Sequence, residues 1–463
     1  MKITVIGGGP GGYEAAIYAA KKGAEVVLVE KQEVGGTCLN RGCIPTKAFL
    51  ASYDALEAVE TAKNFGILGV GEEVTNDYKA IVERKNKVME SLVKGIKFLC
   101  KQNNVTIMNG FGKMTDAHHV EVTLNEGGVE TVETDYIILA TGSVPTCPPV
   151  FNVDRKRVIT SDEILDFEEA PKSLVLVGGG VIGCEIGQFL NKMGTEVTIV
   201  EALPRIMATM DEDVSKQITR QFKKEKLKVI AGDGIAEVNP YEDHVEVKLA
   251  SGKELSADYC LVAIGRAPFT TGVGLEEAGV ELGERGRVKV NEYLQTTAEN
   301  IYAIGDILPS AQLAHVASFE GMVAVDNIMG AKKTMTYHAV PGCVFTNPQL
   351  ASVGILEWQL QKEGKELDKD YKIGTFDFKG LGKAQASGHL TGFVKVIVDM
   401  NDVLIGAEIV GSGASDMLQV LTTAIQLKLT SEQVLESIFP HPSMCEAIKE
   451  ALHDVHGLSV NKG

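Results

Sequence analysis

A glycine pattern that occurs twice constrains the fold of this 463-residue chain more than any other feature. Each copy follows a short apolar segment, at residues 2–6 and 173–177, in G-x-G-x-x-G spacing: Gly7, Gly9, Gly12, and Gly178, Gly180, Gly183. The offset of 171 residues also relates Glu30 to Glu201. Each copy predicts a strand, a tight turn and a helix, so the chain is expected to contain a duplicated unit of an α/β fold.

This spacing of glycines is typical of dinucleotide binding. The first glycine permits the tight turn, the second lets backbone N–H groups approach a pyrophosphate, and the third lets the helix pack on the strand. The N-terminus of the helix then stabilises the anion. Two such units predict two dinucleotides on one chain, with electron transfer between them. The alternative is a pair of glycine turns that bind no ligand.

The acidic residue that ends the second strand of each copy indicates which dinucleotide can bind. A carboxylate accepts hydrogen bonds from a ribose diol but repels a 2′-phosphate, so Glu201 favours NAD over NADP. Arg205 stands four residues further on. We expect its side chain to be solvated or paired with an acid.

Composition excludes several classes of protein. The chain is 44% hydrophobic and 23% charged, as in globular proteins, and its length suggests two to four domains. A net charge of −17 opposes binding to nucleic acid. No apolar run is long enough to span a bilayer or to form a signal peptide, so neither a membrane nor secretion is expected. We expect a cytoplasmic protein.

Two cysteines, Cys38 and Cys43, stand close together in the segment GGTCLNRGCIPTK. A metal site would need two further ligands, and no second pair lies nearby. Unrelated core cysteines and a redox disulfide are the remaining alternatives. Pro45 suits the first turn of a helix over 45–60, where the dipole would favour a thiolate at Cys43. Cys38 would lie on the preceding loop, more open to an incoming thiol.

A histidine near the C-terminus has two interpretations. His441 precedes Glu446 by five residues in the segment FPHPSMCEA. In the first interpretation, Pro442 begins a helix, and Ser443 and Glu446 form a capping box. The second interpretation, in which His441 is a base, rests on the family resemblance given below and suits a residue that exchanges protons near neutral pH.

The segment around Cys38 and Cys43 resembles the redox-active disulfide of the flavoprotein pyridine nucleotide-disulfide oxidoreductases. Within that family, it is most similar to the branch that oxidises protein-bound dihydrolipoamide with NAD. Further segments resemble the family in the family's own order: 140–145, 263–268, 296–306, 313–321 and 345–354. Residues Asn347, Gln349, Phe439, Ser443 and Cys445 depart from its usual pattern. The alternative is a related NAD(P)H-dependent reductase of another small disulfide.

The resemblance implies a set of site residues. Cys38 and Cys43 would form the redox disulfide, His441 would be the base with Glu446 as its partner, and Lys47 would pair with Glu185. The residues expected to bind FAD are Gly7, Gly9, Pro10, Gly12, Glu30, Gly36, Thr37, Lys47, Gly112, Ala140, Thr141, Gly142, Asp306, Ala314 and His315. The residues expected to bind NAD are Gly178, Gly180, Gly183, Glu201 and Gly265. No metal is expected.

The resemblance also implies the architecture. We expect two Rossmann-like dinucleotide-binding domains and an α+β C-terminal dimerisation domain. Residues 1–143 and 264–335 would form the FAD-binding and central domain, 144–263 the NAD-binding domain, and 336–463 the interface domain. The family forms homodimers in which the histidine acts on the partner's disulfide. The protein that we expect to bring the substrate to this chain is a lipoyl carrier protein, or the lipoyl domain of a 2-oxoacid dehydrogenase or glycine cleavage complex.

Overall fold

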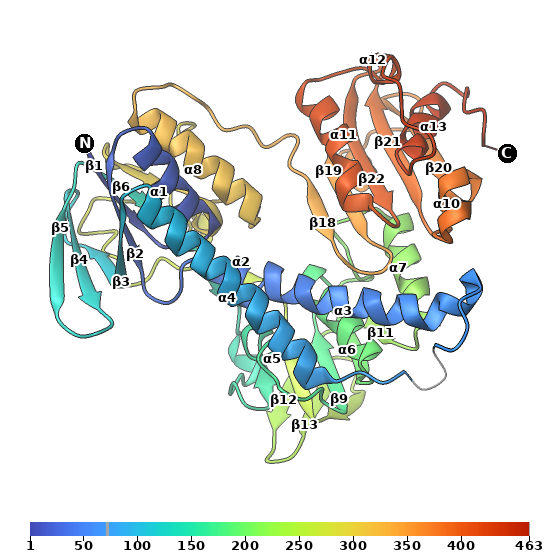
Figure 1. The fold of residues 1–463 in the computed structure, drawn as a ribbon, viewed down its shortest axis with the longest axis horizontal. Helices are drawn as coiled ribbons and strands as arrows, with labels where there is room; N and C mark the ends of the chain where they lie inside the picture. Colours follow the sequence, from blue (N-terminus) through green and yellow to red (C-terminus); the bar gives the residue numbers. More distant parts are fainter. Residues whose placement is uncertain (71–73, 463) are drawn as a thin grey trace. The chain divides into compact units, whose positions relative to one another are not determined.

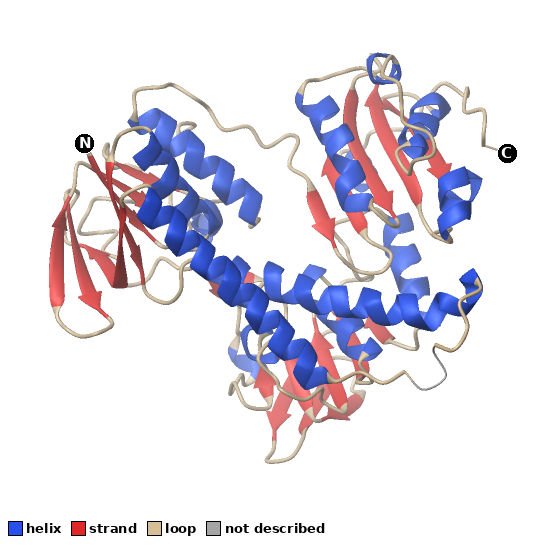
Figure 2. Cartoon of the chain, viewed as in Figure 1, coloured by secondary structure: helices blue, strands red, loops and turns tan. Residues whose placement is uncertain are grey.

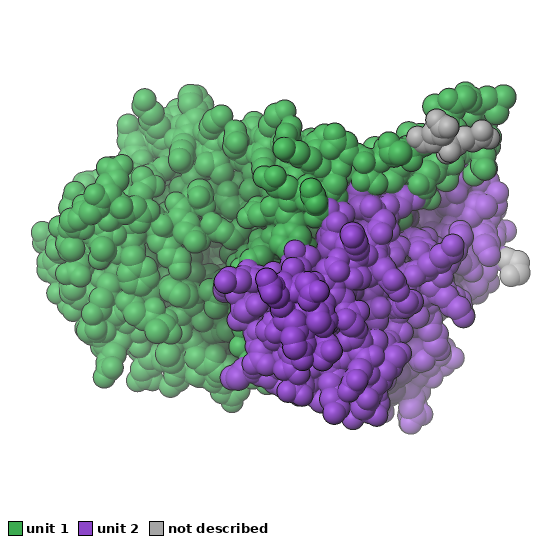
Figure 3. Space-filling view, turned by 90° about the horizontal axis from the view of Figure 1, so that it is seen from below, with its two compact units in different colours: residues 1–148, 159–169, 264–335 green, residues 149–158, 170–263, 336–463 purple. Residues whose placement is uncertain are grey.

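The computed structural model describes residues 1–70 and 74–462, which separate into two compact units (Figure 3). Unit 1 comprises residues 1–148, 159–169 and 264–335, and unit 2 comprises residues 149–158, 170–263 and 336–463. Both units contain helices and strands (Figure 2). The predicted fold class is confirmed. The three predicted domain boundaries remain predictions.

Unit 1 is built on a seven-stranded sheet with the order β17-β6-β1-β2-β3-β4-β5 (Figure 1). Its first five strands pair in parallel, and β3, β4 and β5 form an antiparallel meander. The strands are β1 (Lys2–Ile6), β2 (Glu25–Glu30), β3 (Val105–Met114), β4 (His119–Leu124), β5 (Val129–Glu133), β6 (Tyr136–Leu139) and β17 (Ile301–Ala303). A separate ribbon joins β7 (Ser143–Pro145) to β16 (Arg266–Pro268).

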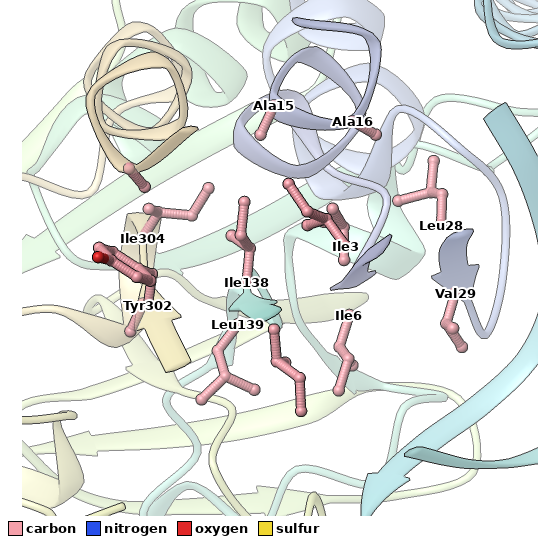
Figure 4. Close-up of a cluster of buried hydrophobic side chains, with 14 of the residues drawn as sticks. Ile3, Ile6, Ala15, Ala16, Leu28, Val29, Ile138, Leu139, Tyr302 and Ile304 are labelled. Atoms are coloured by element: carbon pink, nitrogen blue, oxygen red, sulfur yellow. The ribbon is translucent and has the colours of Figure 1, made fainter. Parts of the chain in front are cut away.

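The parallel strands of unit 1 are apolar because helices cover them. Ala15 and Ala16 of helix α1 (Pro10–Lys21) lie over Ile3 and Ile138 of the sheet, and all four side chains are fully buried (Figure 4). The other helices of the unit are α2 (Gly36–Arg41), α3 (Cys43–Thr61), α4 (Tyr78–Gln102), α5 (Ser161–Ile164) and α8 (Ala314–Ile328), with short 3₁₀ turns η1 (Ala62–Phe65), η3 (Glu284–Gly286) and η4 (Gly305–Ile307). This core fixes the ends of β1 and β2, where the first glycine loop begins.

Unit 2 contains three sheets. The first is parallel, in the order β11-β10-β9-β15, with the short β8 (Val158–Ile159) at its edge. The second is the antiparallel β12-β13-β14, and the third is the antiparallel β18-β19-β22-β21-β20. The half predicted to bind a nucleotide, called the nucleotide-binding half below, holds β9 (Ser173–Val177), β10 (Glu196–Glu201), β11 (Lys228–Ala231), β12 (Ile235–Pro240), β13 (Val245–Leu249), β14 (Glu254–Ala257) and β15 (Tyr259–Val262), with η2 (Pro149–Phe151), α6 (Val181–Lys192) and α7 (Glu212–Lys224).

The C-terminal half of unit 2 buries its own apolar core between the third sheet and its helices. Its strands are β18 (Gly342–Val344), β19 (Leu350–Gly354), β20 (Tyr371–Asp377), β21 (Phe393–Asp399) and β22 (Leu404–Val410). Its helices are α9 (Glu357–Lys362), η5 (Phe378–Gly380), α10 (Gly382–Ser387), α11 (Ala414–Gln426), α12 (Ser431–Leu435) and α13 (Glu446–Asp454).

A buried ion network joins the two halves of unit 2. Lys395 Nζ lies 2.7 Å from Asp211 Oδ2 and 2.7 Å from Glu357 Oε2. Burial alone would lower the pKa of Lys395, but its hydrogen bonds to these two carboxylates raise it above its ordinary value. Burial and the neighbouring Asp211 charge raise the pKa of Glu408. Burial and charge thus both favour the neutral form of Glu408 over its ionised form.

A buried carboxylate ties the C-terminal end of α8 to α1 in unit 1. The Asp326 side chain, only 4% exposed, accepts a hydrogen bond from Tyr18 Oη (3.0 Å) and ion-pairs with Lys22 and Lys333. Burial would raise the pKa of Asp326, but the hydrogen bonds from Lys22, Lys333 and Tyr18 outweigh it and lower the pKa to about 2.

The Asp326 carboxylate should stabilise unit 1 in a pH-dependent way. Its folded pKa of about 2 lies below the ordinary value of 3.8. Its contribution is therefore complete above the unfolded pKa and is lost as pH falls toward 2. We expect Asp326→Asn to lower the thermal unfolding midpoint clearly at pH 7 and about half as much at pH 3, as measured by circular dichroism.

Glu281→Gln is the control for this prediction. It removes an exposed ion pair with Lys289, and exposed pairs contribute roughly 0–1 kcal/mol. We expect a negligible shift at either pH. An Asp326→Asn difference of equal size at pH 7 and pH 3 would contradict the assignment.

Candidate active site

The first glycine loop has the geometry that its sequence predicts. Gly7 adopts a φ of +108°, and a Cβ atom on Gly12 would lie 1.8 Å from the Gly7 carbonyl oxygen. Glu30, at the end of β2, uses both carboxylate oxygens within the unit. Oε2 accepts the Gly8 N–H (2.6 Å), and Oε1 accepts the Gln32 N–H (2.7 Å). The acid predicted to bind ribose therefore also holds the loop in shape.

The second glycine loop repeats this arrangement at positions 171 residues later. Gly178 adopts a φ of +111°, and a Cβ atom on Gly183 would lie 2.0 Å from the Gly178 carbonyl oxygen. Glu201 Oε2 accepts the Gly179 N–H (2.7 Å), and Oε1 accepts the Leu203 N–H (2.8 Å). The duplication read from the sequence is therefore present bond for bond in the structure.

Both loops leave room for a pyrophosphate at the helix N-terminus. The N-cap residues of helices α1 and α6 are Gly9 and Gly180. Since glycine has no side chain, no side-chain atom of the N-cap residue bonds to the first N–H groups of either helix. A Cβ atom on Gly180 would meet no atom within 4 Å, and one on Gly9 would meet only Gly36 Cα at 4.0 Å. The cradle and the helix dipole fit the phosphates of a dinucleotide.

Arg205 corrects an expectation. Its guanidinium is half-buried, and its hydrogen bonds go to backbone rather than to an acid: Nη2 donates to the carbonyl oxygens of Met210 (2.9 Å) and Ala208 (3.3 Å). The Arg205 side chain thus stabilises the loop that contains it. This arrangement is consistent with the preference for NAD inferred from Glu201.

The two cysteines lie at the junction of two helices. Cys38 lies within α2, which corrects the prediction that it stands on a loop. Cys43 is the first residue of α3, as expected, although this helix begins two residues before Pro45. Gly42 joins the helices, and a Cβ atom there would lie 3.1 Å from the Thr37 carbonyl oxygen and 3.5 Å from Cys38 Cα. The glycine therefore permits the tight turn between the cysteines.

The side chains of Cys38 and Cys43 interact directly. A hydrogen bond to Cys43, followed by burial, raises the pKa of the Cys38 thiol, and the charge of Lys47 offsets part of this effect. Cys43 is exposed, whereas Cys38 is half-buried, the reverse of the expected order. Such close sulfurs are what a disulfide requires.

The cysteine segment is attached to the first glycine loop through backbone alone. The Gly35 N–H donates to the Gly8 carbonyl oxygen (2.7 Å). Gly36 adopts a φ of +56°, and a Cβ atom there would lie 2.6 Å from Gly9 Cα. The segment that carries the sulfurs therefore lies directly against the loop predicted to hold the FAD pyrophosphate.

The remaining residues predicted to bind FAD all belong to unit 1. Gly112 lies on β3, Thr37 on α2, Lys47 on α3, and Ala314 and His315 open α8. Ala140, Thr141 and Gly142 form the turn after β6, where the Ala140 N–H donates to the Ile6 carbonyl oxygen (2.8 Å). Asp306 lies in η4 and accepts a hydrogen bond from Ser143 Oγ (2.5 Å). Sequence reasoning missed Ser143, which only the fold brings to Asp306.

His441 and Glu446 form the predicted pair. His441 Nδ1 lies 2.9 Å from Glu446 Oε1, and the Ser443 N–H donates to Glu446 Oε2 (3.0 Å). Burial would raise the pKa of Glu446, but the hydrogen bonds from His441 and Ser443 lower it overall. Helix α13 begins at Glu446 rather than at Pro442, and Ser443 Oγ donates to Pro440. Only half of the predicted capping box is present: Glu446 accepts the Ser443 N–H, but Ser443 Oγ does not cap the helix.

Glu185 lies buried in α6 of unit 2, and its Oε1 accepts the Phe345 N–H (2.8 Å). One turn later, Gln188 accepts the Asn347 N–H (2.8 Å) and donates to the Asn347 carbonyl oxygen (2.7 Å). The C-terminal half thus orients this helix. Lys47 belongs to the other unit, so its pairing with Glu185 remains a prediction. Gly265, with a φ of +128°, belongs to unit 1 rather than to the nucleotide-binding half of unit 2.

Two family models match almost the whole chain. The model of the pyridine nucleotide-disulphide oxidoreductases matches residues 1–321, and the model of their dimerisation domain matches residues 340–452. The chain belongs to this family.

Full-length relatives place the chain within the family. It is 39% identical to a dihydrolipoyl dehydrogenase of Mycobacterium tuberculosis, with 99% of each chain covered. It is 38% identical to the mitochondrial dihydrolipoyl dehydrogenase 1 of Arabidopsis thaliana, covering 97% of this chain and 89% of that one. Among solved structures, LpdA from Mycobacterium tuberculosis matches with a TM-score of 0.91 at 26% identity, covering 98% of this chain and 99% of that one.

A flavoprotein disulfide reductase, RclA from Escherichia coli, also matches, with a TM-score of 0.87 at 27% identity, covering 97% of this chain and 98% of that one. The similarities fit the predicted branch better than the alternative of a reductase for another small disulfide. Family membership confirms an oxidoreductase that acts on sulfur and uses FAD and NAD. A search of the described residues found no helix with the length and hydropathy of a membrane span.

The contact between Gly36 and Gly9 gives a test of how the cysteine segment is positioned. Gly36→Ala should separate the segment from the loop, because its Cβ atom would overlap Gly9 Cα and the positive φ disfavours alanine. We expect purified protein with less bound flavin and a thermal midpoint several degrees lower. Absorbance at 450 nm relative to 280 nm measures the flavin content.

Gly95→Ala is the matched control. Gly95 lies within α4, and a Cβ atom there would meet nothing within 4 Å. Alanine in a helix is favoured over glycine by about 1 kcal/mol, so this variant should retain its flavin and lose no stability. Full flavin content in Gly36→Ala would refute the proposed contact.

Proposed function

We propose that this protein is a dihydrolipoyl dehydrogenase, which oxidises protein-bound dihydrolipoamide to lipoamide and reduces NAD. The observation that carries the proposal is the hydrogen bond between Cys38 of α2 and Cys43 at the start of α3. The segment that holds both cysteines packs against the first glycine loop through Gly36. The full-length similarity to dihydrolipoyl dehydrogenases supports the choice of substrate.

The cofactor positions follow from the two loops. FAD would lie along the first loop, with its pyrophosphate at the N-terminus of α1 and its ribose at Glu30. NAD would lie along the second loop, with its ribose at Glu201. When bound, FAD supplies the two-electron acceptor that reoxidises the cysteines and passes a hydride to NAD.

The thiol chemistry uses three side chains. A thiolate of dihydrolipoamide attacks Cys38 Sγ, the Cys38–Cys43 bond breaks, and Cys43 leaves as a thiolate favoured by the dipole of α3. The second substrate thiol gives its proton to His441 and attacks the mixed disulfide. Lipoamide leaves with its new disulfide, and the cysteine pair holds the two electrons.

The proposed assembly is a homodimer in which His441 acts on the partner's disulfide. The dimerisation domain supports this arrangement, and the C-terminal half presents His441 with 77% and Ile438 with 98% of their surfaces exposed. The substrate would arrive on a lipoyl carrier protein, or on the lipoyl domain of a 2-oxoacid dehydrogenase or glycine cleavage complex. We propose a cytoplasmic location, because the few cysteines suit a reducing compartment.

Replacing Cys43 tests the disulfide mechanism. We expect Cys43→Ser to bind FAD but to lose dihydrolipoamide-dependent NAD reduction by at least about a thousandfold, because no leaving thiolate remains. Anaerobic titration with dihydrolipoamide should produce no long-wavelength thiolate-to-flavin band. Cys147→Ser, at an exposed cysteine of the same unit, should keep the rate and the band. Retained turnover in Cys43→Ser would reject the mechanism.

Replacing His441 tests the base. His441→Gln should slow the dihydrolipoamide half-reaction by about a hundredfold or more, as expected for loss of a general base. Reoxidation of the reduced enzyme by NAD should change little, and stopped-flow absorbance separates the two half-reactions. His389→Gln, at another exposed histidine of the C-terminal half, is the control. Equal slowing of both half-reactions would count against a role in thiol deprotonation.

A further inference from the structure

The ribbon formed by β7 and β16 contains a serine that the function described so far does not use. Ser143 lies on β7 opposite Pro268 of β16 and is 8% exposed. Its polar partners come from two other stretches of the chain. Arg266 belongs to β16, and Asp306 belongs to η4, beyond the next strand of the large sheet.

The hydrogen bonds around Ser143 have only one consistent direction. Arg266 Nε donates to Ser143 Oγ (2.7 Å), and Arg266 Nη2 donates to the Ser143 carbonyl oxygen (2.8 Å). A guanidinium only donates, and a hydroxyl has a single hydrogen. The Ser143 hydroxyl must therefore direct its hydrogen to Asp306 Oδ2, 2.5 Å away.

The backbone beside Asp306 is held equally firmly. Gly305 adopts a φ of +74°, and its N–H donates to the fully buried Glu320 (2.6 Å). Among the described residues, Asp306 Oδ2 bonds to Ser143, and no partner within the chain is found for Oδ1. One carboxylate oxygen is thus fixed while the other stays available to a ligand.

We infer that Ser143 is a positioning residue of the FAD site: Arg266 turns its hydroxyl toward Asp306, which holds the carboxylate with Oδ1 directed to a ribityl hydroxyl. The inference rests on the proposed role of Asp306 toward FAD. A hydrogen bond to an ionised carboxylate is about twice as strong as a neutral one, so its loss should be measurable.

Release of FAD from the purified holoenzyme tests this inference. At a fixed, sub-denaturing guanidinium concentration, the rise in flavin fluorescence gives the release rate, and circular dichroism monitors the fold. Ser143→Ala should release FAD about tenfold to a hundredfold faster, the effect of one hydrogen bond to a charged group. Ser143→Thr retains a hydroxyl and should recover most of the difference.

Ser431→Ala is the matched control for lost stability. It removes a buried serine hydroxyl that donates to the Asp402 carboxylate (2.6 Å) in the C-terminal half. It should lower the unfolding midpoint as much as Ser143→Ala does, without accelerating FAD release. Release from Ser143→Ala within twofold of this control would overturn the inference.

Two further variants complete the test. Asp306→Ala should accelerate FAD release at least as much as Ser143→Ala. If it does not, Asp306 does not bind the ribityl chain, and the premise itself fails. In an Arg266→Met background, Ser143→Ala should have a smaller effect than in the wild type, because the hydroxyl is no longer oriented. Strictly additive effects would show that Arg266 does not act through Ser143.

Discussion

The backbone contact between Gly35–Gly36 and Gly8–Gly9 determines where the sulfur chemistry can take place. No side chain separates these segments, so Cys38 and Cys43 are fixed relative to the N-terminus of α1. A dinucleotide whose phosphates lie at that N-terminus must therefore extend past the cysteines or away from them. The requirement for glycine applies to Gly36, because a Cβ atom there would lie 2.6 Å from Gly9 Cα and would force the two segments apart.

The two copies of the duplicated unit differ in the segment that bonds to the glycine loop. At the equivalent position, the Met207 N–H donates to the Gly179 carbonyl oxygen (2.8 Å), and Ile206 packs against Gly179. In the first copy, Gly35 and Gly36 occupy this place and lead directly into the cysteine helices. The same backbone bond thus closes both loops. The two copies therefore differ in the residues that follow this bond and agree in the glycine loop itself.

The sequence predicted the elements whose chemistry is local. Strands β1 and β9 and both glycine loops follow from spacing over a few residues, whereas the pairing of His441 with Glu446 was predicted from the resemblance to the family. The contacts of Ser143 with Asp306 and of Lys395 with Asp211 join positions more than 160 residues apart, and no local pattern signals them. The hydrogen bonds from Arg205 to backbone carbonyl oxygens were not predicted, because those carbonyl groups belong to an irregular loop. The burial of Lys395 is explained by its ion pairs with Asp211 and Glu357, which only the fold brings together.

The geometry of the histidine pair decides which ring nitrogen can take a proton. An ionised carboxylate only accepts hydrogen bonds, and the lowered pKa of Glu446 keeps it ionised. Nδ1 must then carry the hydrogen that faces Glu446, which leaves the lone pair on Nε2. The Ser443 N–H occupies the other carboxylate oxygen and prevents rotation away from the ring. One defined ring nitrogen on an exposed side chain is the arrangement that the proposed role of His441 as a base requires.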